Sequence, residues 1–183
     1  LLHLAIEVET ADGRRGRGFA ADNLPPKWFD KDPRKTFRDN VEDELVSIRA
    51  AETAYLDAAR VPRPVFDIWE EAYGASRKHC RTLGLNELTA SFGSSFFERA
   101  LADAAGRLAG LDVGGMLRAN TLGLRPEAVH PGLTLDHLRA WAMAAPPEHL
   151  AVRHTVGLLD PIVAADVPAD GWLRDVRDLT RKA

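Results

Sequence analysis

The chain has 183 residues, of which 45% are hydrophobic and 28% are charged, which suits one globular domain or a domain with part of a second. Acidic and basic residues are interspersed and sum to a net charge of −3, which favours neither nucleic-acid binding nor attraction to a membrane. Cys80 is the single cysteine, so an intrachain disulfide and a cysteine-based zinc site are both excluded. No apolar run reaches the roughly 20 residues of a membrane span, and a cytoplasmic protein is expected.

The chain opens with the pattern of a β-hairpin. Apolar and polar residues alternate over 2–8, as in a strand that is buried on one face. Asp12-Gly13 is a tight-turn signal, and residues 15–21 return as a second strand. Gly16-Arg17-Gly18 imitates a dinucleotide-binding fingerprint, but Pro25-Pro26 follows where that site needs a helix. The pattern therefore argues against a dinucleotide site.

Two helices are predicted after the hairpin. Asp32 is expected to cap the first, because Pro33 follows it and proline is favoured in the first turn. An apolar stripe with helical spacing then runs through 37–61. Pro64 is expected to open the second helix, and Gly84 to end it, because glycine adopts the left-handed conformation without strain.

A third helix is predicted within the segment 94–113. Ser95 and Glu98 have the spacing of a capping box, so the helix is expected to begin at Ser95. Small and apolar residues recur at helical spacing and predict a face that another backbone can approach closely. Gly110 is expected to end the helix.

The remainder of the chain mixes loop, helix and strand patterns. Segment 114–133 is rich in Gly and Pro and is expected to be a loop, after which Thr134 caps a short helix at 135–144. Residues 150–157 have the pattern of a strand that ends in a turn. Apolar residues in 172–179 then predict an amphipathic helix, which would complete a βα unit.

One run within the third helix carries a resemblance to a known family. It reads Glu98-x-Ala100-Leu101-x-Asp103-x-x-Gly106-Arg107-x-x-Gly110-Leu111-x-Val113. This run resembles the last long helix of the N-terminal capping domain in the enolase superfamily, and most of all the mandelate racemase/muconate lactonizing enzyme branch. The usual run there is Glu-x-Ala-x-Trp-Asp, then Lys or Arg, then Gly-x-Pro-Val. Ala102 stands here in place of the tryptophan, and Asp112 in place of the proline.

The resemblance implies a fold and a domain organisation. Residues 1–133 would form an α+β capping domain, in which a small antiparallel sheet packs on a helical bundle. Residues 134–147 would form a linker helix, and residues 148–183 the first strand and helix of a TIM-like barrel. Both ends of the chain fall inside element patterns, so a fragment of a longer protein is expected.

The resemblance also implies substrate-binding residues on two segments. In the family, the loop after the hairpin closes over the mouth of the barrel, and the carboxyl end of the first barrel strand faces the active site. The residues concerned are Asp22, Asn23, Lys27 and Trp28 in the loop and His154 and Thr155 at the strand end. Ordinary alternatives stay open: an exposed connection with Trp28 packed on the hairpin, and a buried, hydrogen-bonded His154.

The chemistry implied by the resemblance is magnesium-assisted removal of a proton next to the carboxylate of a small substrate. In the family, the base, typically in a Lys-x-Lys run, and the acidic metal ligands lie on later barrel strands, and no residue of this chain matches them. The chain is therefore expected to cap the substrate of a homo-oligomeric isomerase or lyase, while binding no metal and being inactive alone. The alternative is a non-catalytic α+β module that binds another protein.

Overall fold

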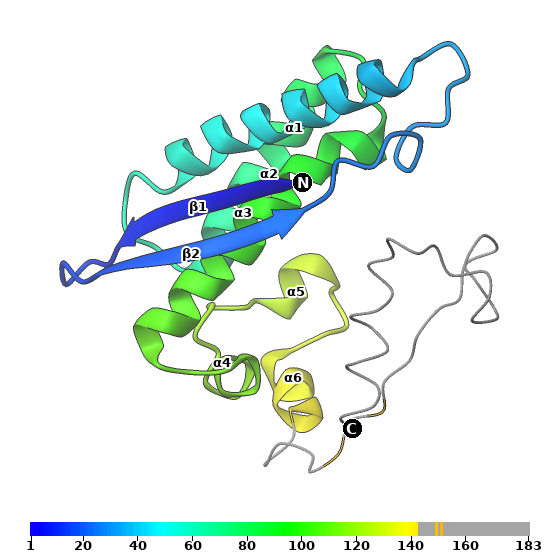
Figure 1. Ribbon diagram of the computed structural model, residues 1–183. Coiled ribbons are helices and arrows are strands. Elements are labelled where there is room, and N and C mark those ends of the chain that lie inside the picture. The colour runs from blue at the N-terminus through cyan, green and yellow to red at the C-terminus, as the bar shows by residue number, and fades with distance from the viewer. Residues whose placement is uncertain (143–148, 150, 152–183) are drawn as a thin grey trace, which may run out of the picture. The chain divides into compact units, whose positions relative to one another are not determined.

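The computed structural model describes residues 1–142, 149 and 151, and this part of the chain has an α+β architecture (Figure 1). The chain divides into two compact units, Leu1–Pro146 and Pro147–Ala183, and the elements below belong to the first. They are β1 (Leu2–Glu9), β2 (Arg15–Asp22), α1 (Phe37–Ala58), α2 (Val65–Thr82), α3 (Glu87–Ala109), α4 (Val113–Ala119), α5 (Pro126–Val129) and α6 (Leu135–Trp141). The strand and helix predicted at 148–183 lie outside the described residues, apart from the isolated residues 149 and 151.

The predicted hairpin is confirmed. β1 and β2 pair antiparallel in a register that runs from Leu2 opposite Asp22 to Glu9 opposite Arg15. Gly13 closes the turn with a φ of 81°, a conformation that glycine adopts without strain. Apolar side chains of β1 alternate with exposed ones and pack against the helical core, as the period-2 pattern indicates.

The hairpin lies along α3, with β2 next to the helix (Figure 1). Gly18 allows this close approach, because a Cβ atom added there would lie 1.9 Å from the carbonyl oxygen of Ala100. Phe19 donates its backbone N–H to Oδ2 of Asp103 at 3.0 Å. Arg99 reaches the carbonyl oxygen of Ala21 at 3.4 Å. The outer edge of β2 is therefore hydrogen-bonded to side chains of α3.

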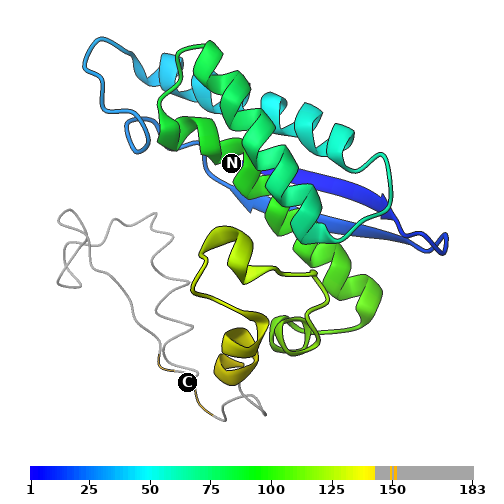
Figure 2. The ribbon, with the colours of Figure 1, turned by 180° about the vertical axis from the view of Figure 1, so that it is seen from behind.

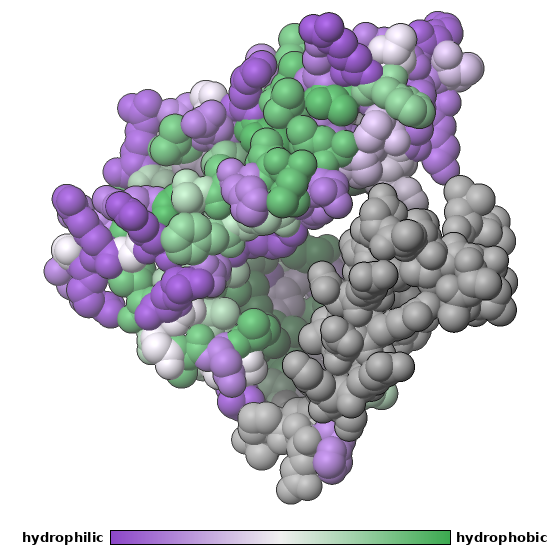
Figure 3. Space-filling view, viewed as in Figure 1, coloured by the Kyte–Doolittle hydropathy of each residue, from purple (hydrophilic) through white to green (hydrophobic). Residues whose placement is uncertain are grey.

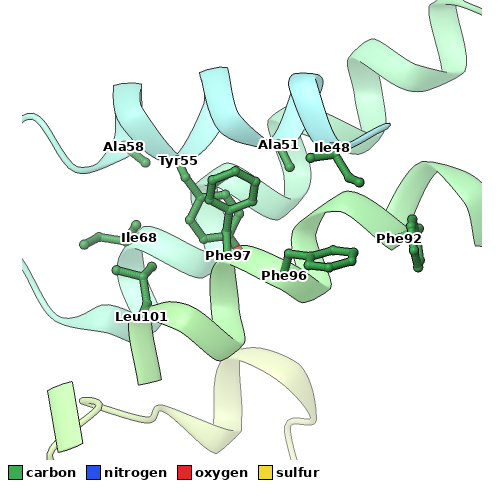
Figure 4. Packing of buried hydrophobic residues seen from close by; sticks show 10 residues of the cluster. Ile48, Ala51, Tyr55, Ala58, Ile68, Phe92, Phe96, Phe97 and Leu101 are labelled. Carbon is green, nitrogen blue, oxygen red and sulfur yellow. The ribbon is translucent and has the colours of Figure 1, made fainter. Parts of the chain in front are cut away.

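The three long helices α1, α2 and α3 pack against one another and form the main core (Figures 2 and 4). The Tyr55 ring stacks on the Phe97 ring with centroids 5.2 Å apart, and its hydroxyl lies 2.7 Å from Oγ of Ser94. Gly93 lets α1 and α3 approach closely, because a Cβ atom there would lie 2.2 Å from the carbonyl oxygen of Ser47. Within the predicted segment 94–113, Ala100 and Ala104 of α3 are fully buried and lie against Gly18 of β2, so the small-residue face predicted there is close-packed.

Two predicted helix starts are wrong. α1 begins after Thr36, whose hydroxyl accepts the N–H of Asp39 in a capping box, while Asp32 instead binds Arg34 within a turn. α3 begins after Asn86, eight residues before the predicted start. Ser95 lies inside that helix and donates to the carbonyl oxygen of Phe92. In both cases the sequence offers two possible N-caps. The helix begins at the one that also allows its side chains to pack in the core, Thr36 for α1 and Asn86 for α3.

The first turns of α1 do not bury the apolar residues that the sequence pattern predicts. Phe37 is 67% exposed, whereas the polar residues Asn40, Glu44 and Ser47 face the core. The segment 114–133, which was expected to be a loop, contains most of α4 and all of α5. The Asp112 side chain caps the start of α4, and Pro126 occupies the first turn of α5. Gly110 ends α3 with a φ of 65°, as predicted.

None of the helices in the described part of the chain combines the length and the apolar composition that a membrane-spanning helix needs.

Candidate functional site

The candidate site is the loop that joins β2 to α1, residues 23–36, because it is tightly organised yet leaves a large aromatic side chain exposed. Lys27 has a φ of 65°, which is uncommon for a residue other than glycine. Its backbone N–H donates to Oδ1 of Asn40 at 2.9 Å. Its ammonium group donates to the carbonyl oxygens of Asp32 at 2.7 Å and Lys35 at 2.6 Å. Lys27 therefore ties the two ends of the loop together.

A second lysine fastens the loop to α1. The ammonium of Lys35 lies 2.8 Å from Oδ2 of Asp30 and 2.7 Å from Oδ2 of Asp43. These hydrogen bonds, with Asp30 contributing most, raise the pKa of Lys35 above its ordinary value. The same contact with Lys35 lowers the pKa of Asp30. Lys35 and Asp30 therefore both stay charged near neutral pH, so the charge-assisted bond between them persists there.

The loop is also attached to the start of α3. The Phe29 ring packs on the Phe92 ring with centroids 4.7 Å apart. Nδ2 of Asn86 donates to the carbonyl oxygen of Phe29 at 3.3 Å, and the same side chain caps α3 through its oxygen. The loop conformation is therefore fixed by contacts to two helices.

Trp28 lies between these anchors and is 70% exposed. So large an exposed fraction leaves little of the Trp28 side chain packed against the rest of the described chain. At the end of the molecule where this loop lies, the surface in Figure 3 is mainly hydrophilic, with some hydrophobic residues among the hydrophilic ones. A large aromatic side chain on a fixed loop can bury much area against a ligand with little loss of conformational entropy.

The other predicted substrate-binding residues divide into two groups. Asp22 ends β2 and lies 3.2 Å from Nη1 of Arg99, and the N–H of the exposed Asn23 donates to its carboxylate at 2.9 Å. Asn23 shares the loop with Lys27, whose ammonium is already bonded to two carbonyl oxygens, and Asp22 directly precedes this loop. His154 and Thr155 lie outside the described residues.

A buried polar strip lies on α1 beneath the loop. Asn40 and Glu44 are at most 2% exposed, and Nδ2 of Asn40 and Oε2 of Glu44 have no hydrogen-bond partner in the described part of the chain. Burial away from water raises the pKa of Glu44 to about 7, and the charge of Asp43 adds to the effect. Sequence reasoning missed this strip, although polar residues at i and i+4 on the core side of a helix are a readable signal.

The described residues do not fit the magnesium ion that the resemblance implies. Among them, no three His, Cys, Asp or Glu side chains lie close enough together to hold a metal ion. Asp30 and Asp43 share Lys35 instead. No step through magnesium is derived for this part of the chain.

A shallow pocket of about 300 Å³ lies over the outer face of β2 and the end of α3. Three arginines line it, but each is paired with an acidic side chain. The pairs are Arg15 with Glu9, Arg17 with Glu7 and Arg107 with Asp103. The pocket therefore carries no excess positive charge that would select an anion.

Comparisons of this chain with protein-family models, with curated proteins and with solved structures find no match.

Proposed function

We propose that this chain is the substrate-capping part of an enzyme of the enolase superfamily, in the mandelate racemase/muconate lactonizing enzyme branch. The observation that carries the proposal is the loop in which Lys27 and Lys35 make internal contacts and Trp28 remains exposed. The hairpin packed on helices and the run from Glu98 to Val113 are consistent with such a domain.

In this proposal, Trp28 covers a small carboxylate-bearing substrate, with Asn23 and Asp22 beside it as polar contacts. Covering a substrate removes water from the reacting groups and selects substrates by the shape of their side chains. The magnesium ion and the base would be held by residues outside the described part. Backbone strain at Lys27 supports a functional loop, because such strain is concentrated at sites where geometry matters.

The second candidate function is a non-catalytic module that binds another protein. The exposed Trp28 is also the observation that favours it, because tryptophan is enriched among the residues that dominate binding energy in protein interfaces. The two proposals differ in what the loop contacts: the side chain of a small acid or the surface of a protein.

Proton exchange tests the capping proposal. The complete gene product, supplied with Mg²⁺ in D₂O, is mixed with a panel of α-hydroxy and α-amino carboxylic acids, and deuterium at the α-carbon is followed by NMR. We expect exchange with at least one acid, and a loss of about tenfold in kcat/KM for Trp28→Ala with a smaller loss for Trp28→Phe. A Trp28→Ala protein as active as the wild type, or an absence of exchange with every acid, would count against the proposal.

A further inference from the structure

A groove of about 510 Å³ lies between α1 and α2, and no part of the proposed capping function uses it. Its volume falls within the range of about 300–1,000 Å³ that is usual for sites that bind small molecules. Val46, Ala50 and Ala54 of α1 are half-buried in the groove, and Ala75 of α2 lines it as well. These short side chains leave an apolar depression between the two helices.

The middle of the groove contains one polar residue, and its polar group is already used. Thr53 lines the groove, but its hydroxyl donates to the carbonyl oxygen of Arg49 at 3.2 Å, within α1. The methyl groups of the alanines and of Thr53 are therefore what a ligand meets there. Such a surface gains binding energy from apolar groups and from nothing else.

One end of the groove is different, because Arg49 and His79 both line it there. Arg49 lies between Val46 and Ala50, which pack against Cys80, the residue that follows His79. The two polar side chains are therefore at the same end. Neither makes a hydrogen bond or an ion pair within the described part of the chain.

The opposite end of the groove offers no free charge. Asp57 lines it, eight residues or about 12 Å along α1 from Arg49. Its carboxylate pairs with Arg60 at 2.8 Å on the same helix. Among the residues that line the groove, the unneutralised charge is therefore positive and lies at the Arg49 end alone.

We propose that this groove binds a free alkyl carboxylate, the anion of a medium-chain fatty acid. The Arg49 guanidinium presents the fork of N–H groups that matches a carboxylate, and the His79 ring has at least one N–H to donate beside it. The alkyl chain then lies over Ala50, Ala54 and Ala75 and ends near Asp57. The site is separate from the Trp28 loop and does not depend on the proposed function.

The distribution of polar groups favours this ligand over a helix of another protein. A helix is about 10 Å wide with its side chains and has polar groups along both flanks. It would need partners along the whole groove, whereas the unpartnered side chains Arg49 and His79 lie at one end. A single headgroup on a thin, unbranched tail uses those two side chains and leaves no polar group of its own over the apolar floor.

Titration calorimetry of the complete 183-residue chain with decanoate, below the concentration at which decanoate forms micelles, tests the proposal. We expect a dissociation constant of about 1 mM or tighter. Arg49→Gln should weaken binding by about tenfold, because it removes a charge-assisted hydrogen bond. Arg38→Gln is the matched control, because Arg38 is an exposed cation of the same helix that does not line the groove, and it should leave the affinity unchanged.

The apolar floor is tested separately from the headgroup. Ala75→Gln should weaken decanoate binding by about fivefold, because it places a polar side chain on the floor, and circular dichroism should show an intact fold because Ala75 is exposed and glutamine favours helices. Hexanoate should bind about 15-fold more weakly than decanoate. Each of the four missing methylene groups then accounts for about a factor of two, half the effect of complete burial on the free energy. Decylammonium should bind at least about tenfold more weakly, because it places a cation beside Arg49.

A wild-type chain that does not bind decanoate overturns the proposal. So does binding that Arg49→Gln and Ala75→Gln both leave unchanged, because the anion is then bound elsewhere. Binding that is lost in Trp28→Ala but kept in Arg49→Gln would place the anion at the loop. Association with phosphatidylserine vesicles or with an acidic amphipathic peptide, in the absence of decanoate binding, would assign the groove to a membrane or to a protein and would overturn the proposal as well.

Discussion

Glu44 is a buried acid whose ionisation affects the stability of this fold. Its carboxyl group is 1% exposed, and Oε2 has no hydrogen-bond partner in the described part of the chain. Burial raises its pKa from an ordinary value of 4.5 to about 7. The folded state therefore binds this proton more tightly than the unfolded state does, and ionisation at higher pH opposes folding.

This difference predicts how stability varies with pH. The contribution of Glu44 is unaffected by pH below about 4.5, where both states are protonated, and becomes unfavourable as the pH rises to about 7. The free energy of unfolding of the wild type, relative to Glu44→Gln, should fall by about 3 kcal/mol across this range. Urea unfolding at a series of pH values measures it.

Glu42→Gln is the control for this experiment, because Glu42 lies on the same helix but its side chain is exposed and pairs with Arg38. That variant should keep the full pH dependence of the wild type. A Glu44→Gln protein with an unchanged pH dependence would show that Glu44 ionises without penalty in the folded state.

The N-cap of α3 can be tested by substitution. Asn86 accepts the N–H groups of Leu88 and Thr89 and should be the true cap, so Asn86→Ala should lower the free energy of unfolding by about 1 kcal/mol. Ser95→Ala should change it by less than about 0.5 kcal/mol, because Ser95 lies inside the helix. Chemical denaturation of the two variants checks this, and the reverse order would place the helix start at Ser95.

Two helical glycines should respond to alanine with opposite signs. Gly93 of α3 faces the backbone of Ser47, and a Cβ atom would lie 2.2 Å from its carbonyl oxygen, so Gly93→Ala should destabilise the protein by about 3 kcal/mol. Gly74 of α2 has open space around it, so Gly74→Ala should stabilise the protein by about 1 kcal/mol. Melting temperatures measure both, and a tolerated Gly93→Ala would contradict the close α1–α3 contact.

The elements whose residues repeat with a regular period could be predicted from the sequence. The hairpin follows from the alternation of β1 and its Asp12-Gly13 turn, and the end of α3 follows from Gly110. The helix starts did not follow, because Asp32 and Ser95 are acceptable caps locally, and only packing selects Thr36 and Asn86 instead.

The position of the loop between the hairpin and α1 was predictable from the sequence, but the hydrogen bonds that hold the loop were not. The sequence indicates a functional loop around Trp28 through its polar and aromatic residues and its resemblance. It does not reveal that Lys27 turns inward, because that depends on a positive φ and on carbonyl groups five and eight residues away. The support from Asn40 and Asn86 comes from two helices, which sequence spacing alone does not bring together.

In the described part of the chain, the helices and the β-hairpin form a scaffold that fixes the loop between β2 and α1. Lys27 and Lys35 hold the loop, Phe29 anchors it to α3, and the Trp28 side chain is left exposed. A surface that is fixed before binding loses little entropy when a ligand arrives. The loop should therefore keep its conformation when a substrate is bound.

A crystal structure of the complete gene product with a bound carboxylic acid tests this claim most directly. We expect the Trp28 ring to contact the ligand within about 4 Å, with the hydrogen bonds of Lys27 to Asp32 and Lys35 intact. A structure in which Trp28 faces bulk solvent, with residues 23–36 remote from the ligand, would contradict it.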